Sequence, residues 1–284
     1  ISKSPLKPKL LMQYIEDKNL IQYFDIVSDF QPFNQSDFYI AHSKDYVDGF
    51  FYGRKPICES NGLKWSKQFA DSIRYTNSSL YHAIKHSILH PNEVSFSPTS
   101  GFHHATPDRG GGFCTFSGQV IASMKIYNEY GLSGAYLDLD GHYGNSIKDS
   151  YDFCPKLYKA IPLGCNINPN YRHKKYIKDF LYNLDLLEKR LLNNEVHYLV
   201  WCHGADSHEA DDLGGQLTTD EWIQCSTLFY SWLKRINKSL NRSIPLTLSL
   251  FGGYRKDNYL SVLNLHTSDL IKCINIFHEY SLIN

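Results

Sequence analysis

Short apolar runs alternate with amphipathic stretches along most of this chain. Residues 134–139, 196–201 and 244–251 are nearly continuous in apolar residues and are too short for buried helices, so we expect strands there. Between them lie stretches such as 176–192, whose apolar residues recur at helical spacing. Parallel strands need helical crossovers of this kind. The pattern therefore predicts an α/β fold with a central, mostly parallel sheet flanked by helices.

The remaining segments fit the same architecture. We expect a short strand at 94–96, a first helix within 10–24, and further helices at 43–51, 64–89, 118–130, 219–232 and 261–276. Thr219 precedes two acidic residues and is the expected N-cap of its helix. No internal repeat and no linker rich in Pro, Gly or Ser divides the chain, so we expect one domain over residues 1–284.

Composition excludes several classes of protein. The 29 basic and 29 acidic residues give a net charge of +0, which argues against direct nucleic-acid binding. No apolar run approaches the ~20 residues needed to span a bilayer, so no membrane partner is expected. The seven cysteines include no C-x-x-C pair and predict reduced thiols in a cytoplasmic compartment, with a nuclear location or export left open. Because the chain opens at Ile1 rather than Met, we expect further residues upstream.

Histidines and acidic residues gather just past the ends of the expected strands. Asp140 and His142 stand two apart on an extended segment, so they face the same side, and Asp206 after the next strand is a candidate third ligand. Two carboxylates and one imidazole leave a position open for water, which suits a catalytic zinc; the alternative is a solvated strand end with a helix-capping Asp. His103 and His104 either aim both rings into one cavity or form one packed and one solvated ring.

Other polar residues carry weaker signals. His203 and His208 flank the third candidate ligand, and we expect His203 to be packed rather than metal-bound. Glu209, Asp211 and Asp212 are predicted to form a solvated loop. His82, His86 and His90 share one helix face, for which a solvated or partly packed role is expected, and the Gly-Gly-Gly at 110–112 lacks the features of a phosphate loop.

Four motifs together resemble a known family. G-F-H-H-A at 101–105 with G-F-C at 112–114, D-L-D-G-H-Y-G-N at 138–145, G-A-D at 204–206 and G-G-Y at 252–254 occur in the order found in the histone deacetylase family. These motifs resemble those of its zinc-dependent, class II-like members, which have the arginase/deacetylase fold. The resemblance implies that 1–284 is a single deacetylase-like catalytic domain.

The resemblance implies two cation sites. Asp140, His142 and Asp206 match the zinc ligands. Family members also hold a potassium ion beside the zinc, partly through Asp138, Asp140 and backbone carbonyls, with its other ligands in the stretch after residue 145.

It also implies the catalytic residues. His103 and His104 match the tandem histidines, of which His104 is the general base and then the general acid. Asp138 matches the carboxylate that orients His103, and Asn145 matches the partner of His104. Tyr254 matches the tyrosine that donates a hydrogen bond to the substrate carbonyl.

The substrate tunnel departs from the family in part. Gly112 and Phe113 match its wall, and Leu213 matches a rim position. Tyr143 stands where a second histidine is usual, and residues 146–171 lack the F-P-G-T-G pattern that supplies another tunnel aromatic.

The expected reaction is hydrolysis of the acetyl amide of acetyl-lysine in a protein or peptide. An apolar Leu213 at the rim goes with acetyl-lysine, whereas an acidic residue there would attract cationic polyamines. A small-molecule amidohydrolase, such as an acetylpolyamine deacetylase, is the alternative. A catalytically dead acyl-lysine binding module is a third, which the presence of Tyr254 with all three ligands argues against.

Overall fold

The structure is a computed structural model that describes residues 3–278. Its strands are β1 (Val94–Ser97), β2 (Gly134–Asp138), β3 (Asn166–Ile167), β4 (Tyr198–His203) and β5 (Leu246–Leu250). Its α-helices are α1 (Lys7–Asp17), α2 (Lys44–Phe51), α3 (Lys67–Leu89), α4 (Gly118–Tyr130), α5 (Ser146–Ser150), α6 (Leu157–Ala160), α7 (His173–Leu192), α8 (Thr219–Leu240) and α9 (Tyr259–His278).

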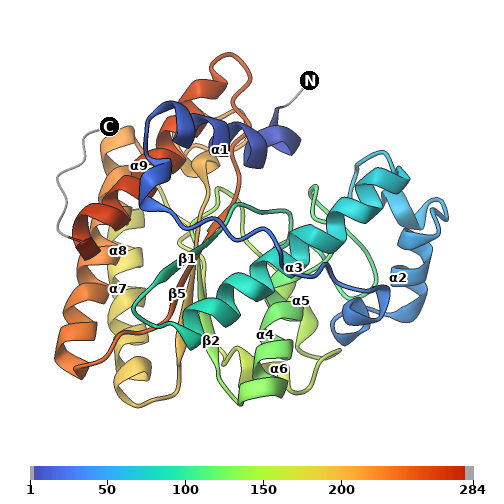
Figure 1. Ribbon diagram of the computed structural model, residues 1–284, viewed down its shortest axis with the longest axis horizontal. Helices are drawn as coiled ribbons and strands as arrows, with labels where there is room; N and C mark the ends of the chain where they lie inside the picture. Colours follow the sequence, from blue (N-terminus) through green and yellow to red (C-terminus); the bar gives the residue numbers. More distant parts are fainter. Residues whose placement is uncertain (1–2, 279–284) are drawn as a thin grey trace.

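The five strands form one parallel sheet in the order β1-β5-β4-β2-β3. Every residue of β2, β4 and β5 is buried, as expected for strands covered on both faces. Helices α7, α8 and α9 lie on one side of the sheet, and α3 and α4 lie on the other (Figure 1). The predicted α/β fold with a central parallel sheet is confirmed.

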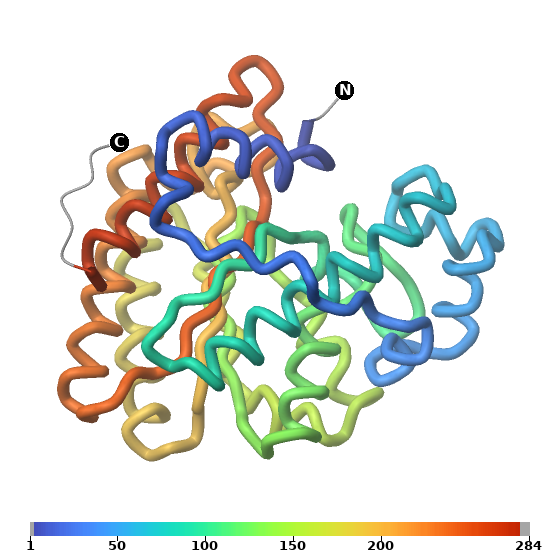
Figure 2. Tube along the Cα trace, in the orientation of Figure 1, coloured from blue at the N-terminus to red at the C-terminus, as the bar shows by residue number. Residues whose placement is uncertain are grey.

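The N-terminal segment reaches across the molecule. Helix α1 packs against α9, and the chain after it crosses over α3 towards α2 (Figure 2). Along this crossing the Ser78 hydroxyl donates to the carbonyl of Gln31, and the Phe33 amide donates to the carbonyl of Arg74 at 3.3 Å. The N-terminal segment is therefore attached both to α9 and to α3, on opposite sides of the sheet.

The loop between β1 and α4 rests on an aromatic cluster. The ring of Phe116 lies 4.6 Å from that of Phe38, 5.1 Å from Phe50 and 5.0 Å from His42, measured between centroids. Phe38, Phe50 and Phe116 are fully buried. This cluster fixes the end of a loop that carries His103 and several other predicted site residues.

Several boundaries differ from expectation. Thr218, not Thr219, is the N-cap of α8: its hydroxyl accepts from the Glu221 amide, and Glu221 in return accepts from the Thr218 amide. The predicted first helix is wrong beyond Asp17, where α1 ends. Strand β3 and helices α5 and α6 were not anticipated. Within residues 3–278, no helix is both long enough and apolar enough to cross a membrane.

Candidate active site

The parallel topology brings three strand ends to one edge of the sheet. Strand β2 ends at Asp138 and leads directly into Asp140 and His142, while its neighbour β4 leads into Asp206. The loop after β5, on the far side of β4, carries Tyr254. These residues are far apart in sequence and meet because parallel strands all point their carboxyl ends to the same edge.

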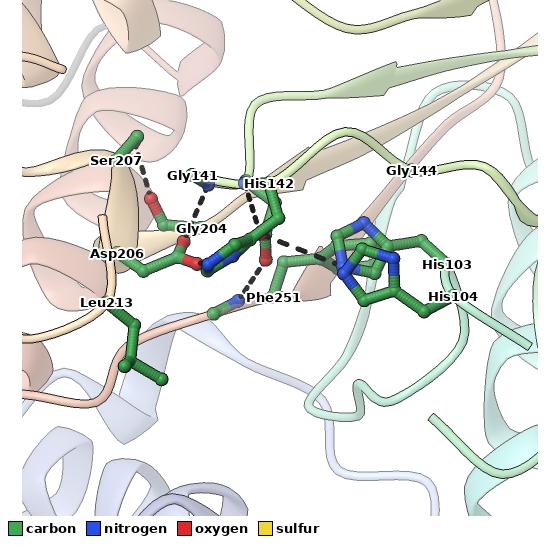
Figure 3. A network of polar contacts seen from close by, with 12 residues as sticks. His103, His104, Gly141, His142, Gly144, Gly204, Asp206, Ser207, Leu213 and Phe251 are labelled. Atoms are coloured by element: carbon green, nitrogen blue, oxygen red, sulfur yellow. Dashed lines mark hydrogen bonds and ion pairs between the residues drawn. The ribbon is translucent and has the colours of Figure 1, made fainter. Parts of the chain in front are cut away.

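Asp140, His142 and Asp206 form a compact cluster whose potential ligand atoms all lie within 4.8 Å of one another. His142 Nδ1 is 3.0 Å from Asp140 Oδ1 and 3.0 Å from Asp206 Oδ2, and Figure 3 shows its ring between Asp206 and the tandem histidines. Both carboxylates are buried, whereas the His142 side chain is 37% exposed. The cluster thus opens to the surroundings on its histidine side.

The electrostatics of this cluster favour a cation. Hydrogen bonds to Asp140 and Asp206 raise the pKa of His142 to about 10. Burial, together with the neighbouring Asp140 carboxylate, raises the pKa of Asp206 to about 7. Two buried carboxylates this close need positive charge between them, so the donor set fits a divalent metal.

The tandem histidines lie beside this cluster in different environments. Their ring centroids are 4.1 Å apart. His103 Nδ1 is 3.0 Å from Asp138 Oδ2; although burial opposes its charge, the carboxylates of Asp140 and Asp138 raise the pKa of His103 to about 9. His104 Nδ1 is 2.9 Å from Asn145 Oδ1, a neutral partner, and burial and the His103 charge lower the pKa of His104. A charged ring and a neutral ring therefore stand side by side.

Tyr254 faces the cluster from the loop after β5. Its ring centroid lies 6.4 Å from that of His142 and 6.2 Å from that of Phe113. Burial, with the nearby Asp140 and Asp206 carboxylates adding to it, holds the pKa of Tyr254 far above its usual range. The phenol therefore stays protonated and remains a hydrogen-bond donor.

Gly112 and Phe113 border the same space. Gly112 has a φ of +49°, and a Cβ there would lie 2.5 Å from His104 Cδ2, so this position needs glycine. The Phe113 side chain is 48% exposed, as a wall beside an open space requires. Leu213 is 47% exposed on the loop after β4 and lies near Asp206 (Figure 3).

The other histidines are engaged elsewhere. His203 stacks on Trp222 with ring centroids 3.6 Å apart, so it is packed as expected. His208 Nε2 is 2.9 Å from the Thr219 hydroxyl. His86 lies on α3, and its Nε2 is 2.8 Å from a carboxylate oxygen of Glu93 in the turn that follows this helix. Among residues 3–278, none of these histidines belongs to a group that could hold a metal.

One buried residue and one buried side-chain atom escaped the sequence analysis. Lys7 is 1% exposed, its ammonium donates to the carbonyl of Phe251, and burial lowers its pKa to about 8. Its spacing from Leu11 and Ile15, both buried on the same face of α1, was a signal for that burial. Asn166 on β3 carries a buried Oδ1 without a hydrogen-bond partner among the described residues. A two-residue strand gives no periodic signal that would reveal it.

A comparison with protein families decides the relationship. The model of the histone deacetylase domain matches residues 2–159, more than half of the chain. The chain belongs to the histone deacetylase family. The resemblance seen in the sequence motifs is thereby confirmed, and this family consists of deacetylase hydrolases that generally depend on zinc.

Individual relatives are distant. Histone deacetylase 2 of Arabidopsis thaliana is 26% identical over 191 residues, which cover 61% of this chain and 48% of that protein. Chloroplastic histone deacetylase 10 of Oryza sativa subsp. japonica is 24% identical over 147 residues, which cover 46% of this chain and 33% of that protein. The matched part of the chain thus spans a third to about half of these curated relatives.

The fold is also shared with a solved structure. The crystal structure of the HDA15 HD domain superposes with a TM-score of 0.72 and covers 98% of this chain and 84% of that chain. At 13% identity this likeness supports the fold alone.

Proposed function

We propose that residues 1–284 form one catalytic domain that hydrolyses the acetyl amide of acetyl-lysine in proteins or peptides and depends on zinc. The observation that carries the proposal is the buried cluster of Asp140, His142 and Asp206 next to His103 and His104. A cation site, a proton-transfer pair and a protonated tyrosine at one edge of the sheet are the parts that amide hydrolysis needs.

Asp140, His142 and Asp206 would hold the zinc. The fit rests on the donor set, because two carboxylates and one imidazole are the ligand types that catalytic zinc takes with a further position open. When bound, zinc supplies a Lewis acid that polarises the amide carbonyl and lowers the pKa of water. Backbone amides hold the carboxylates in place: Gly252 N donates to Asp140 Oδ2 at 2.8 Å and Gly141 N donates to Asp206 Oδ1 at 3.0 Å.

His104 would move the proton. Asn145 fixes its Nδ1, which leaves Nε2 for the reaction. Nε2 accepts the proton of the attacking water and then delivers it to the leaving amine of the lysine. His103, held between Asp138 and Asp140, would keep its ring fixed beside that of His104.

Tyr254 would donate its hydroxyl hydrogen to the carbonyl oxygen of the substrate. That oxygen gains negative charge as the water attacks, so the hydrogen bond strengthens in the transition state. The raised pKa of Tyr254 suits this role because only the protonated phenol can donate.

We infer that a potassium ion beside the zinc site would be held by a second set of oxygens. Asp138 and Asp140, with backbone carbonyls, would hold it. Asn166 is paired across β2 and β3 with Tyr136, and its Nδ2 donates to the Gly144 carbonyl at 3.0 Å. Its buried, unpartnered Oδ1 is then available to a hard cation.

The rim favours a lysine stem over a polyamine. Leu213 offers only apolar contact to a chain entering the cavity. The adjacent carboxylates of Asp211 and Asp212 accept hydrogen bonds from the backbone amides of Tyr254, Arg255 and Lys256. These hydrogen bonds leave both carboxylates charged, so acetyl-lysine is favoured by the apolar side chain of Leu213 alone.

Metal analysis and activity test the proposal together. Purified protein should hold about one zinc per chain, and Asp140→Ala or His142→Ala should lose both metal and activity. His86→Ala removes a surface histidine on α3 and should change neither. Full activity of protein shown to contain no metal would contradict the zinc assignment.

Substrate profiling tests the chemistry. An acetyl-lysine peptide should give a higher kcat/KM than acetylspermidine, and Tyr254→Phe should lower kcat ~100-fold or more with zinc retained. A tenfold or greater preference for acetylspermidine would replace this proposal with the polyamine one.

A further inference from the structure

A carboxylate outside the cation cluster holds the main chain of the Tyr254 loop. Asp211, on the loop after β4, accepts hydrogen bonds at Oδ2 from the amide of Tyr254 at 2.7 Å and from that of Arg255 at 3.2 Å. Its other oxygen, Oδ1, accepts from the amide of Leu213 at 3.0 Å. The loop is partly exposed, as the sequence predicts, but the carboxylate of Asp211 is in addition engaged by three backbone amides.

The loop needs such an anchor because of its sequence. Its first part is fixed near the cation cluster, where Gly252 N donates to Asp140 Oδ2 and Gly252 O accepts from Ala205 N at 2.9 Å. Gly253 then has a φ of +142°, a conformation that glycine enters and leaves easily. Helix α9 begins only at Tyr259, so Tyr254 lies on irregular chain whose position depends on side-chain contacts.

We propose that Asp211 is a positioning residue that sets the reach of the Tyr254 hydroxyl into the cavity. The inference rests on the proposed function, in which Tyr254 donates to the substrate carbonyl. A carboxylate that accepts from two successive amides fixes both the position and the direction of the main chain between them. A hydrogen-bond donor displaced by about 1 Å loses much of its effect on a transition state, so the anchor acts on catalysis through Tyr254.

The same carboxylate connects the rim to the tyrosine. Leu213, expected to contact the substrate, and Tyr254, expected to act on its carbonyl, share Asp211 as their backbone anchor. The two loops, one after β4 and one after β5, therefore cannot shift independently while this carboxylate is intact.

Asp212, the next residue in the chain, provides a matched control for substitution of Asp211. It is exposed, and its Oδ2 accepts from the Lys256 amide at 3.2 Å, beyond Tyr254 in the loop. It carries the same charge as Asp211 but holds neither Tyr254 nor Leu213. A general effect of negative charge near the rim would appear in both variants, whereas positioning of Tyr254 would appear only at Asp211.

The test measures kcat and KM on an acetyl-lysine peptide for Asp211→Ala, Asp211→Asn, Asp212→Ala, Tyr254→Phe and the double variant Asp211→Ala/Tyr254→Phe. We expect Asp211→Ala to lower kcat ~100-fold with KM changed less than about threefold, because the lost contact acts in the transition state. Zinc content should stay unchanged. Asp211→Asn, which keeps one acceptor oxygen and the same shape, should fall between Asp211→Ala and wild type. Asp212→Ala should stay within about threefold of wild type.

The double variant separates positioning from a merely structural role. If Asp211 acts through Tyr254, the double variant should be about as slow as Tyr254→Phe alone, because the tyrosine contribution is already absent. A double variant whose loss in kcat equals the product of the losses in the two single variants would overturn the proposal. The proposal would also be overturned if both Asp211 variants kept the wild-type kcat while Tyr254→Phe was slow. That result would leave the proposed function intact. Wild-type kcat in Tyr254→Phe would instead overturn the assigned role of Tyr254 and, with it, the inference about Asp211.

Discussion

Protonation of His42 should destabilise the protein as the pH falls. The ring is buried, its Nδ1 donates to the carbonyl of Thr106 at 2.9 Å, and its Nε2 accepts from the amide of Ser117 at 2.9 Å. These two partners bracket the segment that carries Gly112 and Phe113 and that follows His103 and His104. A neutral ring satisfies both contacts, whereas a protonated ring presents a hydrogen to the Ser117 amide and loses that hydrogen bond.

The size of the effect follows from the pKa. Burial lowers the pKa of His42 from 6.5 to about 4, although the Thr106 carbonyl and the charge of Asp108 oppose this shift. Between these two pKa values the unfolded chain binds more protons than the folded one, so the free energy of unfolding falls as the pH falls. At ~1.4 kcal/mol per pKa unit, His42 contributes about 3 kcal/mol above pH 6.5, and this contribution is lost by about pH 4.

Urea unfolding of metal-free protein between about pH 7 and pH 4 measures this contribution. His42→Gln is the comparison, because an amide side chain offers both an acceptor and a donor but does not titrate in this range. Other histidines titrate equally in both proteins, so the difference between the two curves isolates His42. We expect wild type to lose about 3 kcal/mol relative to His42→Gln across this range. A difference that stays constant with pH would refute the reasoning.

Three further outcomes are expected. Leu213→Glu should lower the ratio of kcat/KM for an acetyl-lysine peptide over acetylspermidine by about tenfold, because a carboxylate at this half-exposed position attracts the polyamine charge; an unchanged ratio would remove Leu213 from substrate choice. His104→Ala should lower kcat ~100-fold or more and at least as much as His103→Ala, and steady-state kinetics showing the reverse order would assign the base to His103. Gly252→Ala should release zinc, because its Cβ would lie 2.1 Å from Asp206 Cγ, and metal analysis finding full occupancy would count against this packing.

The sequence predicted those parts of the fold that repeat a local pattern. Strands β1, β2, β4 and β5 agree with their predicted positions within about two residues, because buried parallel strands have continuous apolar runs. Strand β3, at Asn166–Ile167, is too short to show any pattern. Helices α5 and α6, of five and four residues, are below the length at which helical periodicity can be read.

The sequence predicted those residues of the candidate site that come just after a strand in the chain. Asp140 and His142 come directly after β2, and Asp206 comes shortly after β4, so the parallel topology alone brings them to one edge. Asp211 and Asp212 were indistinguishable as adjacent acidic residues. Their different partners depend on the path of the loop after β5, which no local pattern specifies.

The buried contact between Lys7 and Phe251 has a consequence for synthesis of the protein on the ribosome. The two residues are separated by 244 positions in the chain, so the lysine must wait until β5 has emerged before it can reach its acceptor. At translation rates of about 5–20 residues per second, that interval is on the order of tens of seconds. During this time the apolar face of α1, with Leu11 and Ile15, has no partner from α9 to cover it. The nascent chain is therefore expected to present the apolar face of this segment to cellular chaperones for most of its synthesis, and the site at the sheet edge is completed only when the loop after β5 has emerged.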